Sequence, residues 1–224
     1  MSPKAADPRI RTALIEAAAR LLTEEGPEAL TTRRLAAEVG TSTMAVYTYF
    51  DGMESLRREV RREGFARLAE YLEVIETTED TVADVAAMGG AYLLNAVVNR
   101  HLYDQMFGAP PDTHDPEVGH GTLERLVDAV ARAVTEGRFR GDPWELATQC
   151  WAMGHGIVTL HLAGLLTLPE AIQTFGAMGR NLFVGFGDQP AATERSIEAA
   201  HQRLQSLVEE TLGKEALAGA EIPA

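Results

Sequence analysis

The chain has 224 residues, of which 46% are hydrophobic and 24% are charged. This length and composition predict a globular protein with a sizeable core, built as one large domain or two small ones. The single cysteine, Cys150, is expected in the core, and it excludes an intramolecular disulfide bond. We expect a cytoplasmic protein without a membrane span, because the sequence has neither a charged-then-apolar leader nor a long uncharged apolar run.

The formal net charge of −13 is unevenly distributed along the chain. Residues 1–65 hold 10 basic and 10 acidic residues, whereas residues 66–224 hold the other 10 basic and 23 acidic residues. Half of the basic charge therefore lies in less than a third of the chain. A locally basic face on an acidic protein can bind phosphates, with one favoured orientation and a steep loss of binding in salt.

The first predicted helix begins at Pro8, which suits a first helical turn, and ends before Gly26-Pro27. Its apolar residues follow a 3.6-residue period from Ile10 to Leu22. Three basic residues lie near its start: Lys4, Arg9 and Arg11. From the residues alone they read as a solvated, charged helix end; the alternative, contacts to a nucleic-acid backbone, is what the family resemblance described below implies.

Residues 31–50 predict two short helices joined by a tight turn. Thr31 or Thr32 can cap the first helix, and Gly40 ends it in the left-handed conformation that glycine reaches at little cost. Ser42 or Thr43 can cap the second helix. Two helices that meet at a glycine-containing turn match the helix-turn-helix motif, whose second helix enters the major groove of DNA.

This stretch resembles the DNA-binding signature of the TetR family of bacterial transcriptional regulators. The family pattern is Thr-x-Arg-x-apolar-Ala, then a Gly-x-Ser turn, then Tyr-x-(His/Tyr)-Phe. The chain supplies Thr31, Arg33, Leu35, Ala36, Gly40, Ser42, Tyr47, Tyr49 and Phe50 in this order. The family usually carries a phosphate-binding lysine three residues after the phenylalanine, but this chain has Met53 there. Arg57 and Arg58, one turn later, are the candidates to replace it.

The resemblance implies that double-stranded DNA is bound by one set of residues: Thr31, Arg33, Arg34, Ser42, Thr43, Met44, Tyr47, Thr48, Tyr49 and Arg57. Tyr47 is expected to contact a phosphate, and Thr43, Met44, Thr48 and Tyr49 are expected to face base edges. No Arg or Asn lies in the middle of the second motif helix, so two-pronged reading of guanine or adenine from it is not expected.

A long helical pattern runs from Glu54 to about Ile75, and we expect the domain boundary inside it, near residue 65. The predicted DNA-binding domain is 1–65, and the predicted effector-binding and dimerisation domain is 66–224. Further helices are expected over about 81–100, 117–135, 143–166, 168–187 and 191–212, with an irregular stretch at 102–121. No strand pattern is present, so the expected fold is all-α, with a three-helix DNA-binding domain followed by a helical bundle.

The helix over 143–166 is apolar on nearly every face. It therefore either crosses the core or faces the core on one side and a partner chain on the other. Its Trp151, His155 and Gly156 resemble the Trp-His-Gly motif of one TetR-like C-terminal domain class, which implies an all-helical regulatory and dimerisation domain. A homodimer is expected through a four-helix bundle across the two-fold axis, with these interface residues: Trp144, Ile157, Phe175, Met178, Leu182, Phe183 and Phe186.

The resemblance also implies a ligand pocket inside the C-terminal bundle. The expected lining is Met88, Tyr92, Tyr103, Met106, Phe107, Trp151 and His155. Each of these residues alone is more typical of a core position than of a pocket. Together they indicate an apolar effector, aromatic or lipid-like, although the acidic excess could instead favour a cationic one.

No catalytic constellation or cofactor motif is present, so an enzyme is not expected. His114, Asp115, Glu117 and His120 lie close together in the sequence but read as polar loop residues rather than as a metal site. The sequence predicts a homodimeric repressor that a small molecule releases from a near-palindromic operator. The alternative, motivated by Met53, is a TetR-like ligand-binding or protein-interaction module that has lost specific DNA binding.

Overall fold

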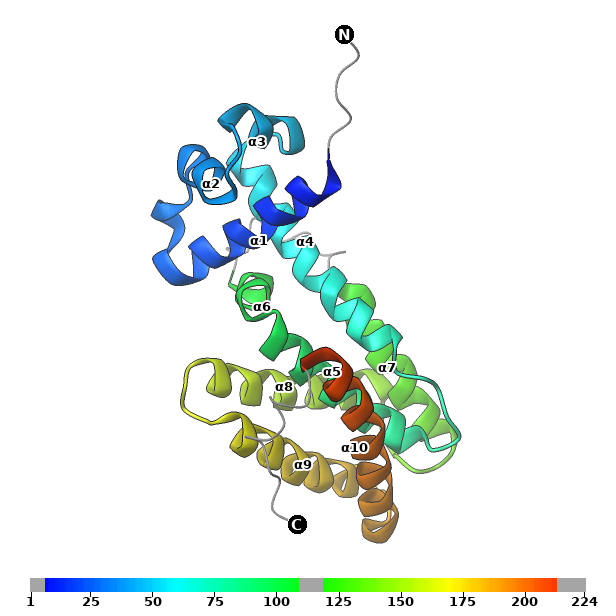
Figure 1. The fold of residues 1–224 in the computed structure, drawn as a ribbon. Coiled ribbons are helices and arrows are strands. Elements are labelled where there is room, and N and C mark those ends of the chain that lie inside the picture. Colours follow the sequence, from blue (N-terminus) through cyan, green and yellow to red (C-terminus); the bar gives the residue numbers. More distant parts are fainter. Residues whose placement is uncertain (1–6, 109–118, 213–224) are drawn as a thin grey trace. The chain divides into compact units, whose positions relative to one another are not determined.

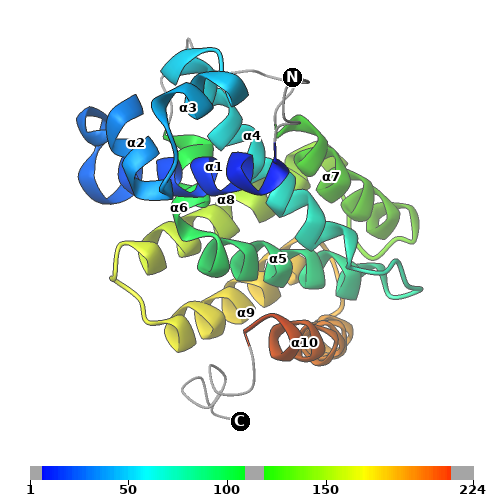
Figure 2. The ribbon, with the colours of Figure 1, turned by 45° about the horizontal axis from the view of Figure 1, so that its top comes forward.

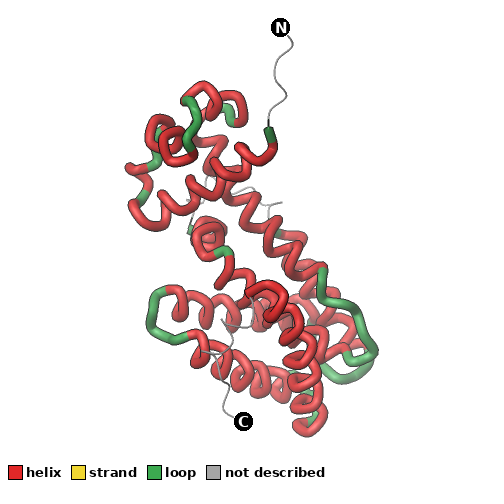
Figure 3. Tube along the Cα trace, in the orientation of Figure 1, coloured by secondary structure: helices red, strands yellow, loops and turns green. Residues whose placement is uncertain are grey.

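The computed structural model describes residues 7–108 and 119–212, and within these ranges every regular element is helical (Figure 1, Figure 3). This confirms the predicted all-α fold. The helices are α1 (Pro8–Glu25), α2 (Thr32–Val39), α3 (Thr43–Tyr49), α4 (Gly52–Glu73), α5 (Thr81–Val98), α6 (Arg100–Phe107), α7 (His120–Thr135), α8 (Pro143–Leu162), α9 (Leu168–Gly185) and α10 (Pro190–Leu212), with a short 3-10 helix at Pro27–Ala29.

The chain forms two compact units. The first unit comprises Met1–Arg67 and Asn99–Gly119, and the second comprises Leu68–Val98 and His120–Ala224. The division passes through α4, the helix in which the sequence analysis places its boundary. It also assigns α6 to the first unit, which the linear boundary near residue 65 does not.

The first unit is built around α1. Asp7 caps this helix by accepting a hydrogen bond from the backbone N–H of Arg9 at 3.0 Å, and Pro8 occupies the first turn. The buried face of α1 packs against α2, α3 and the first half of α4 in one apolar cluster. Its fully buried members include Leu14, Leu21, Leu35, Leu56 and Val60.

The sequence analysis expected an irregular stretch over 102–121, and this expectation is wrong for residues 102–107, which belong to the helix α6. Leu102, Tyr103 and Met106 lie on one buried face of α6, and a Cβ atom at Gly64 of α4 would lie only 2.6 Å from Met106 Cγ. This close approach gives a helix of eight residues enough burial to form. Its apolar helical pattern is short, and the prolines that follow it in the sequence indicated an irregular stretch instead. Residues 109–118 of the expected irregular stretch lie outside the described residues.

The second unit surrounds α5, against which α7, α8 and α10 pack (Figure 2). Among the described residues, α5 is the one helix that is long and apolar enough to cross a membrane, and 67% of it is buried inside the protein. Packing by its neighbouring helices accounts for this apolar character, since thirteen of its side chains are buried.

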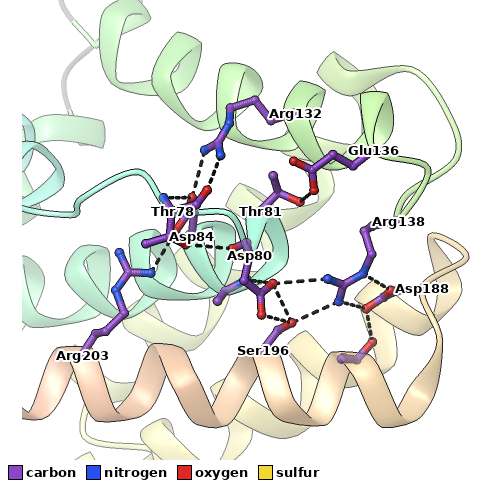
Figure 4. Close-up of polar contacts among 12 residues, drawn as sticks. Thr78, Asp80, Thr81, Asp84, Arg132, Glu136, Arg138, Asp188, Ser196 and Arg203 are labelled. Atoms are coloured by element: carbon purple, nitrogen blue, oxygen red, sulfur yellow. Dashed lines mark hydrogen bonds and ion pairs between the residues drawn. The ribbon is translucent and has the colours of Figure 1, made fainter.

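A group of polar residues at the N-terminal end of α5 ties the second unit together (Figure 4). The buried carboxylate of Asp84 accepts hydrogen bonds from Arg132 of α7 and Arg203 of α10, both at 2.9 Å, and from the backbone N–H of Thr78 at 2.9 Å. Burial raises the pKa of Asp84, but its hydrogen bonds with Thr78, Arg132 and Arg203 outweigh burial and leave the pKa lowered. We call the set Thr78, Asp80, Asp84, Arg132, Arg138, Asp188, Ser196 and Arg203 the polar clasp.

The second half of the polar clasp centres on Asp188. Arg138 reaches both of its carboxylate oxygens, at 2.6 and 2.8 Å, and also contacts Asp80 and Ser196. Burial raises the pKa of Asp188, and its contacts with Arg138 and Thr193 reverse this and lower it. Sequence reasoning did not find this network, because its members come from four separated segments.

Candidate functional site

The two helices α2 and α3 are held by their predicted caps. The Thr31 hydroxyl accepts a hydrogen bond from the backbone N–H of Arg34, and the Ser42 hydroxyl accepts one from that of Ala45, both at 3.2 Å. Gly40 adopts the left-handed conformation with φ of 71° at the turn between them. Thr31 and Ser42, rather than Thr32 and Thr43, are therefore the capping residues. Their hydroxyl groups fix where the two helices of the motif begin.

One face of α3 is buried and the other is exposed. Val46 and the following Phe50 lie in the apolar cluster of the first unit. Thr43, Met44, Tyr47 and Thr48 are exposed. They comprise the expected phosphate contact, Tyr47, and three of the four residues expected to face base edges; the fourth is Tyr49. Met44 is 72% exposed and Tyr47 is 57% exposed, which are high fractions for side chains of this size. This face is neutral and carries no amide side chain.

Tyr49 differs from the role expected for it as a base reader. Its ring packs against the apolar cluster, and its hydroxyl donates a hydrogen bond to the backbone carbonyl of Asp7 at 3.0 Å. The side chain therefore links the start of α1 to the end of α3. Its hydroxyl proton is used inside the protein.

The arginines predicted to bind DNA differ in the partners that they have within the protein. Arg34 forms ion pairs with Glu25 at 2.9 Å and Glu38 at 3.6 Å, and Arg57 donates a hydrogen bond to the carbonyl of Pro27 at 3.2 Å. Arg33 is exposed, and no ion pair is recorded for it within the described residues. It is thus the motif cation that has most freedom to meet a phosphate.

The basic residues at the start of α1 also have acidic partners. Arg9 pairs with Asp7 at 2.9 Å, and Arg11 pairs with Glu59 while its guanidinium lies 5.9 Å from the centre of the Phe50 ring. Lys4 lies outside the described residues. Binding of a phosphate by Arg9 or Arg11 would therefore compete with an existing ion pair.

Met53 occupies the position of the usual lysine without facing outward as a charged group would. It is partly buried against the apolar cluster, and the Thr32 hydroxyl lies 3.4 Å from its sulfur atom. The side chain at this position thus contributes to packing at the start of α4.

Two regions of the chain match known families. Residues 14–60 match bacterial regulatory proteins of the tetR family, and residues 85–182 match the tetracyclin repressor-like C-terminal domain. The chain belongs to the TetR family. It is therefore a DNA-binding transcriptional regulator, with a helix-turn-helix in the first unit.

The likeness of this TetR-family regulator to other proteins extends over both units. An uncharacterized HTH-type transcriptional regulator from Mycobacterium tuberculosis is 27% identical over 175 residues, which span 78% of this chain and 80% of that protein. A structure of a protein with unknown function from Rhodococcus sp. RHA1 has 29% identity and a TM-score of 0.70 over 83% of this chain and 99% of its own. The TetR-family regulator PfmR from Thermus thermophilus shares the fold, with 21% identity and a TM-score of 0.64 over 76% of this chain and 96% of its own.

The predicted pocket residues of the TetR-family regulator fall into two groups. Met88, Tyr92, Trp151 and His155 belong to the second unit, where the Tyr92 hydroxyl lies 3.3 Å from His155 Nδ1. The Trp151 and His155 rings are 6.1 Å apart, and burial lowers the pKa of His155. The other three predicted residues lie on α6 in the first unit: Tyr103, Met106 and Phe107.

Phe175 fills space next to the Tyr92–His155 pair, which sequence reasoning did not anticipate. A Cβ atom at Gly89 of α5 would lie 2.8 Å from the Phe175 ring, and one at Gly154 of α8 would lie 3.3 Å from it. The two glycines therefore admit the aromatic ring of α9 between α5 and α8.

The residues of the TetR-family regulator that were predicted to form the dimer interface include both buried and exposed side chains. Ile157, Phe183 and Phe186 are 3%, 4% and 6% exposed, and both phenylalanines pack against the ring of Phe139. We correct their expected role, because side chains buried within one protomer leave almost no surface for a partner; Phe175 likewise points inward. Exposed apolar side chains on α8 and α9 are Trp144, Trp151, Leu160 and Met178. The helix α8 thus has one core face and one exposed face, and the partner chain expected on the exposed face stays a prediction.

The remaining candidates contribute little chemistry. His114, Asp115 and Glu117 lie outside the described residues, and His120 pairs with Glu124 at 3.3 Å beside the Trp144 ring. Among the described residues, no three His, Cys, Asp or Glu side chains are arranged to hold a metal ion. Burial raises the pKa of Cys150 to about 12, so its thiol stays neutral at physiological pH.

Proposed function

We propose that this TetR-family regulator is a homodimeric repressor that binds a near-palindromic operator and is released from it by a small apolar molecule. The observation that carries the operator contact is the exposed face of α3, where Thr43, Met44 and Tyr47 project from a helix anchored by its Ser42 cap and buried Val46. A helix presented in this way fits the major groove. Arg33 on α2 supplies an exposed positive charge.

The test of operator binding is fluorescence anisotropy with labelled DNA from the region upstream of the protein's own gene. It is run at about 50 and 200 mM salt, because phosphate contacts weaken steeply over this range. Binding should resist scrambled competitor DNA. Arg33→Ala should weaken it about tenfold, the typical cost of a hydrogen bond to a charged group, and should flatten the salt dependence. The matched control is Arg195→Ala, an exposed arginine on α10.

Binding no stronger than to scrambled DNA would move the search to selection from a random DNA library. If that selection enriches no sequence, the operator proposal fails and the alternative remains, namely a ligand-binding or protein-interaction module without specific DNA binding.

The dimer proposal rests on the exposed apolar side chains of α8 and α9, two helices that pack side by side (Figure 2). Leu160 is 43% exposed and Met178 is 44% exposed, so a charge at either position would not disturb the core. Light scattering should show that Leu160→Glu with Met178→Glu shifts the protein to a monomer. Val74→Glu, at a 55% exposed position outside these helices, is the control. A double variant that remains dimeric would contradict this interface.

The effector proposal rests on the second unit, where Phe175 and Tyr92 both approach Gly154 of α8 and the Tyr92 hydroxyl lies 3.3 Å from His155 Nδ1. Met88, one turn before Tyr92 on α5, is also buried. The lowered pKa of His155 keeps its ring neutral near pH 7, so this part of the second unit is polar without carrying a charge. We expect an apolar molecule with a single polar group. A compound library screened for loss of the operator anisotropy signal tests this, and a release by cationic compounds alone would contradict it.

A further inference from the structure

The outward face of α3 carries no group that reads a purine by paired hydrogen bonds. From Thr41 to Phe50 the sequence contains no charged side chain and no amide. The exposed side chains are two threonines, one tyrosine and Met44, whose exposed fraction is 72%. A thioether in the centre of a DNA-reading surface needs a partner of matching chemistry, since it neither donates a hydrogen bond nor accepts one strongly.

The hydroxyl groups around Met44 are partly committed to the protein. Ser42 accepts from the backbone N–H of Ala45, Thr48 donates to the carbonyl of Met44 at 2.9 Å, and Tyr49 donates to the carbonyl of Asp7. Ser42, whose hydroxyl only accepts, and Thr43 and Tyr47 each retain one hydroxyl proton for a ligand. A single hydroxyl can bond many base edges, so these contacts discriminate weakly.

Arginine readout from α2 does not compensate for this. Arg34 is held by Glu25 and Glu38. In the proposed complex Arg33 of α2 meets a phosphate, and phosphate contacts position a protein without reading sequence. Most of the direct base reading therefore falls on Met44 and its neighbours.

In the major groove, guanine, adenine and cytosine are told apart by hydrogen-bond donors and acceptors, and the thymine edge alone presents a methyl group. Pressing the Met44 side chain onto a polar edge would remove water without replacing its hydrogen bonds, which is unfavourable. Against a thymine methyl, both partners bury apolar surface. Resting on the proposed operator binding, we infer that Met44 reads the 5-methyl group of thymine and that each operator half-site carries a thymine facing it.

The experiment uses the full-length protein and the DNA sequence that it enriches from a random library. Each thymine of the enriched half-site is replaced in turn by uracil, which lacks only the methyl group. We expect one position at which uracil weakens binding about fourfold, the effect of burying one methylene-sized group. Uracil placed in the flanking DNA is the control for changes in duplex shape.

Two variants test whether the Met44 side chain causes this loss of affinity for uracil-containing DNA. Met44→Ala should bind more weakly, and uracil should then cost nothing further at that position. Met44→Leu keeps an apolar side chain and should keep the penalty. Both changes are at an exposed position, so an unchanged melting temperature should accompany them.

A third variant replaces the thioether at position 44 by an amide. Met44→Gln has similar length but carries an amide, which can bond adenine in a two-pronged manner. A repeated selection with this variant should replace the critical thymine by adenine on the contacted strand. Retention of the original thymine would count against direct reading by residue 44.

The outcomes separate the inference from the function on which it rests. If no sequence is enriched, the proposed operator binding fails, and the inference fails with it. If a sequence is enriched but no uracil substitution weakens binding, or if the penalty persists unchanged in Met44→Ala, the regulator binds its operator by another readout and only the inference is overturned.

Discussion

The Asp84 carboxylate lies 2.9 Å from the guanidinium of Arg203, and this contact joins the N-terminal end of α5 to α10 (Figure 4). Asp84 is 3% exposed, and Arg132 reaches its other oxygen from α7. Three helices of the second unit therefore share one buried negative charge. Arg132 and Arg203 also donate to the carbonyls of Thr78 and Glu76, so the loop between α4 and α5 is held by the same cations.

Replacing this carboxylate should destabilise the regulator strongly. Asp84→Asn preserves shape but removes the charge that two partly buried arginines neutralise, and breaking a buried pair by removing one partner costs about 3 kcal/mol or more. Urea unfolding followed by circular dichroism measures the effect. Glu194→Gln, which breaks an exposed ion pair with Arg180, should leave the unfolding midpoint nearly unchanged. Equal midpoints for the two variants would show that the polar clasp contributes little.

The lowered pKa values of Asp84 and Asp188 predict an acid-sensitive second unit. Each folded-state pKa lies below the unfolded value of about 3.9, so the folded protein binds fewer protons than the unfolded chain in this range. The stabilisation is fully present above the unfolded pKa and is lost as the pH falls through the folded one. Unfolding free energies measured from pH 7 down to 3 should decline at the acidic end, and an Asp84→Asn, Asp188→Asn double variant should decline less.

Much of the first unit was predictable because its signals are local. The caps at Thr31 and Ser42 and the left-handed Gly40 each depend on residues within four positions. The outward direction of Met44 and Tyr47 followed from helical period and resemblance together. By contrast, the hydroxyl of Tyr49 bonds a carbonyl 42 residues away, and no local pattern reports such a contact.

The second unit was less predictable because an apolar residue there can pack against any of several neighbouring helices or face a partner chain. The sequence analysis placed both Met178 and Phe183 at the dimer interface, but Met178 is exposed while Phe183 packs on Phe139. The sequence cannot separate core from interface when both are apolar. The polar clasp was missed for a related reason, since charged residues spread over more than 100 positions show no spacing until the helices are packed.

The Tyr49 hydroxyl bond to Asp7 should couple the stability of the first unit to DNA binding. Tyr49→Phe removes one hydrogen bond and leaves the ring in place, which should lower the unfolding free energy by about 1 kcal/mol. If the start of α1 must be fixed against α3, operator and scrambled DNA should lose affinity by the same factor, because no base contact is altered. Anisotropy on both DNAs gives this comparison. Loss of operator affinity alone would indicate that Tyr49 reads a base after all.

Met53→Lys should test whether this regulator has given up a phosphate contact. The change removes packing against the apolar cluster and the contact with Thr32, so the melting temperature should fall slightly. If the lysine reaches the DNA backbone, operator affinity should rise at low salt. The slope of log affinity against log salt should then steepen by about 0.9, the value for one further neutralised phosphate. Met53→Leu is the matched control, since it keeps the packing and adds no charge. An unchanged slope in the lysine variant would mean that the start of α4 does not approach a phosphate.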